Sequence, residues 1–284
     1  MSQSLDSRLF AYRTDLADIA LQDRIKAERY VKPAPYQVAA NYAPVRRAPR
    51  FDAPLDTQAL YGHIVNVFEI KEGWAWAQLQ TDGYVGYIPE NCLSSDIAEV
   101  THCITAPSTF VYPAPDIKTP PLETLTLNAS INITEVTEKF VKTSENTYIY
   151  AAHTSHLENE CGDFVHFAEN FKYTPYLWGG CTYFGIDCSG LVQLALHASG
   201  HTSAPRDSDM QLHTLGTALP NINPKTHLKR GDLVFWKGHV GIMTDNTNLL
   251  HANGYHMQTV IEPLEIAVKR IAEIYGSVVA IKRF

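Results

Sequence analysis

YLWGGCTYFGIDCSGLVQLALHASG, residues 176–200, decides the fold of the C-terminal part of the chain. Its second half spaces apolar residues at the period of a helix, and Gly200 ends the run, so we expect a helix from about residue 188. The apolar face of this helix holds Leu191, Val192, Leu194, Ala195 and Ala198. Cys188, which follows Asp187, then lies in the first turn. A helix N-terminus lowers the pKa of a thiol and can hold an oxyanion, so the pattern indicates a nucleophilic cysteine.

A cysteine nucleophile also needs a histidine that the fold brings near it. Residues 237–253, KGHVGIMTDNTNLLHAN, have the pattern of a β-hairpin that turns at residues 245–247. His239 and His251 are equally far from residue 245, and directly opposite residues in an antiparallel pair have Cβ atoms about 5 Å apart. We therefore expect both imidazoles on one face of the sheet, one acting as the base and the other orienting it.

The remaining cysteines have weaker claims to a chemical role. Cys181 is the competitor of Cys188, but it lies in a Gly-rich loop with no helix start behind it. A buried cysteine is usually an inert small hydrophobe, and we interpret Cys92, Cys103 and Cys161 in this way. The odd count of five and the lack of C-x-x-C spacing argue against a disulfide framework and a zinc site. We therefore expect no metal or cofactor and a reducing cytosol.

Composition argues against two classes of partner. The 284 residues include 23 Lys and Arg and 30 Asp and Glu, which gives a formal net charge of −7. No run of basic residues offers a binding surface for nucleic acid, so we expect no nucleic-acid partner. No window of about 18 apolar residues exists, so we expect no transmembrane helix and no membrane partner. The first thirty residues contain no apolar stretch of the signal-peptide type, which favours a cytoplasmic location.

Sequence texture divides the chain into four segments. Residues 1–36 form an arm with some helical spacing, which two prolines interrupt. Residues 37–95 and 96–157 alternate short β-rich runs with turns, which favours two small barrels. Residues 158–284 combine helices with strands, as a compact α+β domain does. In this last domain we expect strands at 232–236, 239–245, 249–253 and 277–284, and a helix at 263–276.

Four motifs of the last domain resemble those of one enzyme family. They are D-C-S-G-L-V at 187–192, P-R-D-S-x-x-Q at 205–211, G-D-L-x-F at 231–235 and H-V-G-I at 239–242. In combination they resemble the NlpC/P60 cysteine peptidases of bacterial cell-wall peptides, over about residues 175–284. The resemblance implies a papain-like α+β fold with a cysteine-bearing helix against an antiparallel sheet. It also implies Cys188 as nucleophile, His239 as base and His251 as the orienting residue.

Two SH3-like barrels before such a domain resemble the γ-D-glutamyl-L-diamino acid endopeptidases of murein peptide recycling. That resemblance implies cleavage between γ-D-Glu and diaminopimelate or Lys in short murein peptides that begin with a free L-Ala. It implies these substrate-binding residues: Tyr84, Tyr176, Trp178, Asp187, Ser189, Asp207 and Ser208. Arg206 is expected to brace the loop. One departure is His63 in LYGHIV, residues 60–65, where the family commonly has Glu, and it bears on the requirement for a free amino end.

Three alternatives stay open at this level. A leader or a strongly basic barrel would favour a secreted hydrolase of intact murein. Loss of Cys188, His239 or His251 would favour an inactive wall-binding module. An amidase or acyltransferase of the same fold would need an apolar acyl channel. The sequence also leaves open the choice between diaminopimelate and Lys, the oligomeric state, and the roles of the arm and the second barrel.

Overall fold

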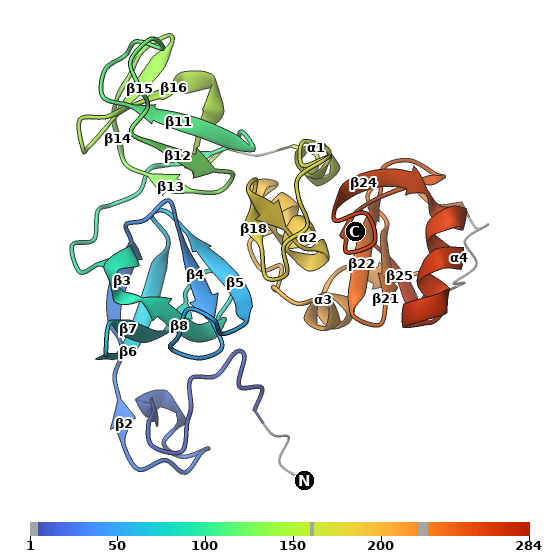
Figure 1. Ribbon diagram of the computed structural model, residues 1–284, viewed down its shortest axis with the longest axis horizontal. Helices are drawn as coiled ribbons and strands as arrows, with labels where there is room; N and C mark the ends of the chain where they lie inside the picture. Colours follow the sequence, from blue (N-terminus) through green and yellow to red (C-terminus); the bar gives the residue numbers. More distant parts are fainter. Residues whose placement is uncertain (1–4, 160–161, 221–226) are drawn as a thin grey trace. The chain divides into compact units, whose positions relative to one another are not determined.

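The computed structural model describes residues 5–159, 162–220 and 227–284 (Figure 1). Its chain divides into two compact units, residues 1–157 and 158–284. In the described residues, the first unit is built of β-strands and short 3-10 turns, and the second combines four α-helices with a six-stranded sheet. Each unit has its own buried core, so each is described by itself.

The first barrel is a seven-stranded antiparallel sheet in the order β5-β4-β8-β7-β6-β3-β9. Its strands are β3 (Ala34–Val38), β4 (Tyr42–Arg46), β5 (Leu55–Leu60), β6 (Ile64–Lys71), β7 (Trp74–Leu79), β8 (Val85–Pro89) and β9 (Leu93–Ser94), with the turn η2 (Glu90–Cys92) before β9. The sheet begins at Ala34, slightly before the expected boundary at 37. Gly83, with φ +78°, lies in the turn between β7 and β8, where a left-handed backbone favours glycine.

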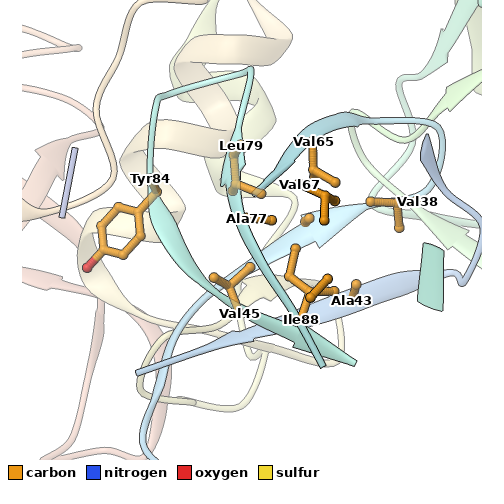
Figure 2. Packing of buried hydrophobic residues seen from close by; sticks show 11 residues of the cluster. Val38, Ala43, Val45, Val65, Val67, Ala77, Leu79, Tyr84 and Ile88 are labelled. Atoms are coloured by element: carbon orange, nitrogen blue, oxygen red, sulfur yellow. The ribbon is translucent and has the colours of Figure 1, made fainter. Parts of the chain in front are cut away.

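Alternate residues of these strands point inward and form the core of the first barrel. Val65 and Val67 of β6, Ile88 of β8 and Val45 of β4 pack together in this cluster (Figure 2). Tyr84, just before β8, is also buried, and Figure 2 shows its ring extending away from the centre of the cluster. The period-two burial explains why the β-rich texture predicts a barrel.

The second barrel has a three-stranded sheet, β13-β10-β17, and a five-stranded sheet, β12-β11-β16-β15-β14. Its elements are β10 (His102–Ile104), β11 (Ser108–Tyr112), β12 (Glu123–Thr126), β13 (Ser130–Ile131), β14 (Ile133–Val136), β15 (Phe140–Thr143), β16 (Tyr148–Tyr150), η3 (Ala151–His153) and β17 (Thr154–His156). The two barrels touch at Gly62, where an added Cβ would lie 2.0 Å from the carbonyl oxygen of Ser130. His63 Nε2 lies 3.0 Å from the carbonyl oxygen of Asn128, so His63 takes part in this contact.

The helical spacing of the arm does not give an α-helix in its described residues. The described part of the arm folds into β1 (Ala17–Asp18), the 3-10 turn η1 (Ile19–Leu21) and β2 (Tyr30–Val31), and β1 pairs with β2 in parallel. Leu16 is buried against Trp76 of the first barrel, and the Arg13 guanidinium lies 4.4 Å from the centre of the same ring. The apolar side chains of the arm thus pack on the barrel, and this tertiary contact overrides a weak helical preference.

The second unit confirms the α+β, papain-like fold class. Its elements are α1 (Phe164–Glu169), β18 (Cys181–Thr182), β19 (Gly185–Ile186), α2 (Cys188–Ala198), α3 (Ser208–Thr214), β20 (Thr217–Ala218), β21 (Leu233–Trp236), β22 (His239–Met243), β23 (Asn248–Asn253), β24 (Gln258–Pro263), α4 (Leu264–Tyr275) and β25 (Ala280–Arg283). The sheet order is β20-β25-β21-β22-β23-β24, so β21 to β24 form an antiparallel meander. The structure adds β24, which the sequence pattern does not predict.

Helices cover both faces of this sheet, with α2 on one side and α4 on the other (Figure 1). Met243 and Leu249 belong to a buried cluster with Leu264 and Ala267 of α4. The alternate residues of β22, among them Val240, are fully buried and point to the opposite face. The main chain of Val240 is hydrogen-bonded to the Cys188 thiol, so the first turn of α2 lies beside the start of β22.

Within the described ranges, we find no helix that combines the length and the apolar character needed to cross a membrane.

Candidate active site

Asp187 fixes the start of α2. Its carboxylate accepts hydrogen bonds from the main-chain N–H groups of Gly190 (2.7 Å) and Gly179 (2.8 Å). Arg206 donates to both carboxylate oxygens, at 2.9 and 2.6 Å, and its side chain is 1% exposed. These contacts occupy the acceptor sites of the carboxylate. Asp187 therefore serves as helix cap and ion-pair partner, and Arg206 braces the loop as expected.

Ser189 and Gly190 complete this buried network. Ser189 Oγ lies 3.0 Å from Arg206 Nη1, which donates to it. A Cβ on Gly190 would lie 2.4 Å from the carbonyl oxygen of Gly180, so the first turn of α2 packs directly on the loop before it. The polar groups predicted to line a pocket at 187 and 189 are thus engaged with Arg206, and their predicted contact with a substrate stays a prediction.

The expectation of an acidic thiol at Cys188 is wrong. The side chain is buried, and this burial, together with the Asp187 carboxylate, raises the pKa of Cys188 to about 12. The N–H of Val240, the Arg206 guanidinium and the N–H of Ser189 act in the opposite direction and do not overcome the burial. Desolvation therefore outweighs the helix dipole, and the cysteine is a neutral thiol near pH 7.

His239 and His251 are hydrogen-bonded, with 2.8 Å between His239 Nε2 and His251 Nδ1. The expected direct pairing of the two residues is wrong. Ile242 pairs with Leu250 and Met243 with Leu249, which centres the hairpin on residue 246 and makes the histidines diagonal neighbours. The displacement of two residues keeps both imidazoles on the same face of the sheet. Burial lowers the pKa of His239 to about 3 and also lowers that of His251.

Glu262 of β24 is a site residue that the sequence analysis missed. Its Oε1 lies 2.7 Å from His251 Nε2, and Arg270 of α4 donates to both of its carboxylate oxygens. Burial raises the pKa of Glu262, but the hydrogen bonds from Arg270 and His251 outweigh it and lower the pKa to about 2. Residues 258–263 mix polar and apolar side chains without a strand-like alternation, so the sequence pattern predicted neither this strand nor the face on which Glu262 lies.

The other predicted binding residues differ in their exposure and in the element that carries them. Tyr176 is half-buried, and burial, with smaller contributions from Cys188 and Asp187, raises the pKa of its hydroxyl. Trp178 is 66% exposed. Asp207 and Ser208, both half-buried, stand at the N-cap and first position of α3. Tyr84 belongs to the first unit.

The other cysteines lie outside the cysteine–histidine site as predicted here, and the described residues hold no cluster suited to a metal ion. Cys181 is buried in β18, Cys92 and Cys103 are half-buried in the first unit, and Cys161 lies outside the described residues. Burial raises the pKa of Cys92. No group of three or more His, Cys, Asp or Glu in the described ranges could hold a metal ion.

Two family models match this chain. The model of the bacterial dipeptidyl-peptidase Sh3 domain matches residues 45–93, and that of the NlpC/P60 family matches residues 173–273. The chain carries an NlpC/P60 domain. The NlpC/P60 match covers the starts of α2 and β22 and the whole of β24, and thus every residue of the cysteine–histidine site. The second unit therefore carries the NlpC/P60 cysteine peptidase domain, and a bacterial SH3 domain precedes it in the chain.

Curated relatives extend the likeness over most of the chain. The γ-D-glutamyl-L-lysine dipeptidyl-peptidase of Bacillus cereus is 27% identical over 242 residues, 74% of this chain and 71% of the relative. The protein of the same name from Bacillus subtilis is 28% identical over 227 residues, 71% of this chain and 73% of the relative. A crystal structure of an NlpC/P60 family protein from Bacillus cereus shares the fold, with a TM-score of 0.71, 20% identity, and coverage of 88% of this chain and 99% of that chain.

Proposed function

We propose that this NlpC/P60 peptidase hydrolyses the bond between γ-D-Glu and an L-diamino acid in short murein peptides with a free N-terminal L-Ala. The observation that carries the proposal is the 2.8 Å hydrogen bond between His239 of β22 and His251 of β23. Val240, the residue after His239 in β22, contacts the Cys188 thiol through its main chain. Two relatives that align over most of the chain are named for cleavage at γ-D-glutamyl-L-lysine. The geometry supports thiol chemistry, and the relatives' names support this bond.

The proposed reaction begins with a neutral thiol and a neutral imidazole. As Sγ of Cys188 attacks the γ-carbonyl carbon of D-Glu, the thiol proton passes to Nδ1 of His239. The positive end of the α2 dipole stabilises the oxyanion that forms. When the C–N bond breaks, the imidazolium returns the proton to the leaving amine of the diamino acid. Water then cleaves the thioester and restores the thiol, releasing L-Ala-D-Glu.

The substrate carries an ammonium group on L-Ala and a carboxylate on D-Glu, so its site needs polar partners of both kinds. Tyr176 and Trp178 are proposed as pocket walls from the family resemblance, and Trp178 presents an exposed side chain. Asp207 and Ser208 are proposed as polar contacts from the start of α3. Asp187 and Ser189 are weaker candidates because Arg206 already engages both. Tyr84 is retained as a proposal from the family resemblance.

We also propose that the activity serves murein peptide recycling in the cytoplasm. Peptides attached to glycan strands have no free amino end, so an enzyme that requires one acts on released fragments. The five cysteines have no spacing typical of a disulfide framework, which suits a reducing compartment. Detection of the activity in the cytoplasmic fraction, and not in culture medium, tests this location.

The experiment that tests the substrate compares four peptides. These are L-Ala-γ-D-Glu-L-Lys, the same peptide with diaminopimelate, its N-acetylated form, and the isomer linked through the α-carboxyl of D-Glu. We expect L-Ala-D-Glu only from the γ-linked peptides with a free amino end. Equal cleavage of the acetylated peptide would refute the free-end requirement and favour a broader murein hydrolase. Absence of cleavage of all four peptides would refute the proposed substrate.

A further inference from the structure

We propose that Glu262, held by Arg270, is a positioning residue that selects the tautomer of His251 and, through it, the tautomer of His239. This inference rests on the proposed role of His239 as the base. Neither residue reaches the thiol or the reacting atoms. Their effect on catalysis would pass entirely through the proton positions on the two imidazoles.

The sheet register brings Glu262 to the histidine face. Leu249 pairs with Glu262 and His251 with Val260, so His251 and Glu262 are diagonal neighbours across β23 and β24. Arg270, two turns into α4, reaches both carboxylate oxygens of Glu262. The ring of Tyr255 lies 4.5 Å from the Arg270 guanidinium and holds it from the other side. The Glu262 and Arg270 side chains are 12% and 16% exposed, so water competes little for these bonds.

Proton counting along the chain gives one arrangement. Glu262 is ionised at neutral pH and can only accept, so Nε2 of His251 must carry the proton in the 2.7 Å contact. A neutral imidazole has one N–H, so Nδ1 of His251 is bare and accepts from Nε2 of His239. His239 is neutral as well, which leaves its Nδ1 bare. In the proposed reaction, Nδ1 of His239 is therefore the nitrogen that takes the thiol proton.

Asn253 competes for the same nitrogen and would impose the opposite arrangement. Its Nδ2 lies 3.1 Å from His251 Nε2 and can only donate. Its Oδ1 accepts from the main-chain N–H of His256 at 2.9 Å and lies 3.0 Å from His256 Nδ1, so turning the amide would break the main-chain bond. Without the Glu262 carboxylate, Nε2 of His251 would accept from Asn253 and Nδ1 of His251 would donate to His239. The proton of His239 would then sit on Nδ1, where it blocks the base.

The test removes the carboxylate and then restores one from the other side. Glu262→Leu takes away the acceptor without adding a donor. We expect kcat to fall about a hundredfold with little change in KM. This loss is smaller than the ~10⁴-fold fall in kcat seen when the residue hydrogen-bonded directly to a catalytic histidine is changed so that the histidine takes the wrong tautomer. Asn253→Asp, added to Glu262→Leu, places a carboxylate oxygen where Nδ2 of Asn253 stood. We expect this double variant to recover at least tenfold in kcat. Glu265→Gln, an exposed carboxylate of α4, is the matched control and should keep the wild-type kcat.

A second measurement needs no substrate. NMR of the ¹⁵N-labelled imidazoles distinguishes protonated from bare ring nitrogens, and we expect His239 to carry its proton on Nε2 in the wild type and on Nδ1 in Glu262→Leu. This result supports the positioning role even if none of the murein peptides is cleaved, in which case only the proposed substrate fails. Unchanged tautomers in Glu262→Leu, or a loss of kcat that Asn253→Asp does not restore, would overturn the inference.

Discussion

His239 Nε2 lies 2.8 Å from His251 Nδ1, and both rings are buried in the middle of the six-stranded sheet. Burial keeps both imidazoles neutral, because it lowers the pKa of each. The hydrogen bond leaves one nitrogen of His239 to take a proton from a thiol that is neutral as well. The pair is therefore suited to a base that acts at the moment of attack, and not to a preformed thiolate and imidazolium.

Thiolate absorbance should reveal this neutral state. Since the pKa of Cys188 is raised to about 12, the thiolate fraction at pH 7 is small and grows only in strongly alkaline solution. We expect no thiolate signal at pH 7 in the ultraviolet difference spectrum of wild type minus Cys188→Ala. A thiolate signal that is present at pH 7 and disappears on acidification would instead indicate a preformed thiolate–imidazolium pair, and would contradict the neutral state.

Arg206→Met should strongly destabilise the second unit. It leaves the Asp187 carboxylate buried without its cation, and breaking a buried ion pair in this way costs about 3–5 kcal/mol. Urea unfolding measures the loss in the free energy of unfolding. The control is Arg230→Met, whose pairs with Asp163 and Glu169 are solvent-accessible and contribute about 1 kcal/mol or less. Equal losses in the two variants would show that the Asp187 pair does not anchor α2.

Gly190→Ala should impair both folding and activity. The new Cβ would lie 2.4 Å from the carbonyl oxygen of Gly180 and 3.0 Å from Asp187 Oδ1, and overpacking of this kind costs about 1–3 kcal/mol. The shift would move the turn that carries Cys188, so we expect kcat to fall more than tenfold in the folded fraction. Gly254→Ala is the control, because no atom lies within 4 Å of its added Cβ. Wild-type stability and kcat in Gly190→Ala would contradict the close packing of this turn.

Local patterns predicted α2 and α4 of the second unit. The apolar spacing of α2 and α4 is read within one segment, and Gly200 and Gly276 end them with φ of +90° and +82°. The strand β24 carries no such signal, since four of its six residues are half-buried. Glu262 therefore could not be placed, although it contacts a histidine that the sequence did single out.

Two properties of the site depend on tertiary structure and were predicted wrongly. The register of β22 and β23 is set by the three-residue turn at 245–247, and a shift of its centre by one residue moved the histidines from opposite to diagonal positions. The low pKa expected of Cys188 was inferred from its position at the helix N-terminus. The packing of α2 on the sheet buries the thiol, and this desolvation decides its pKa.

The most direct test of the central claim is cleavage of L-Ala-γ-D-Glu-L-Lys by wild type, Cys188→Ala and Cys181→Ala. Cys181 is the matched control because it is a second buried thiol in the same unit, in β18. The account predicts release of L-Ala-D-Glu by wild type, the same rate within about twofold for Cys181→Ala, and no release by Cys188→Ala. Release of L-Ala-D-Glu by folded Cys188→Ala at a rate near that of wild type would contradict it.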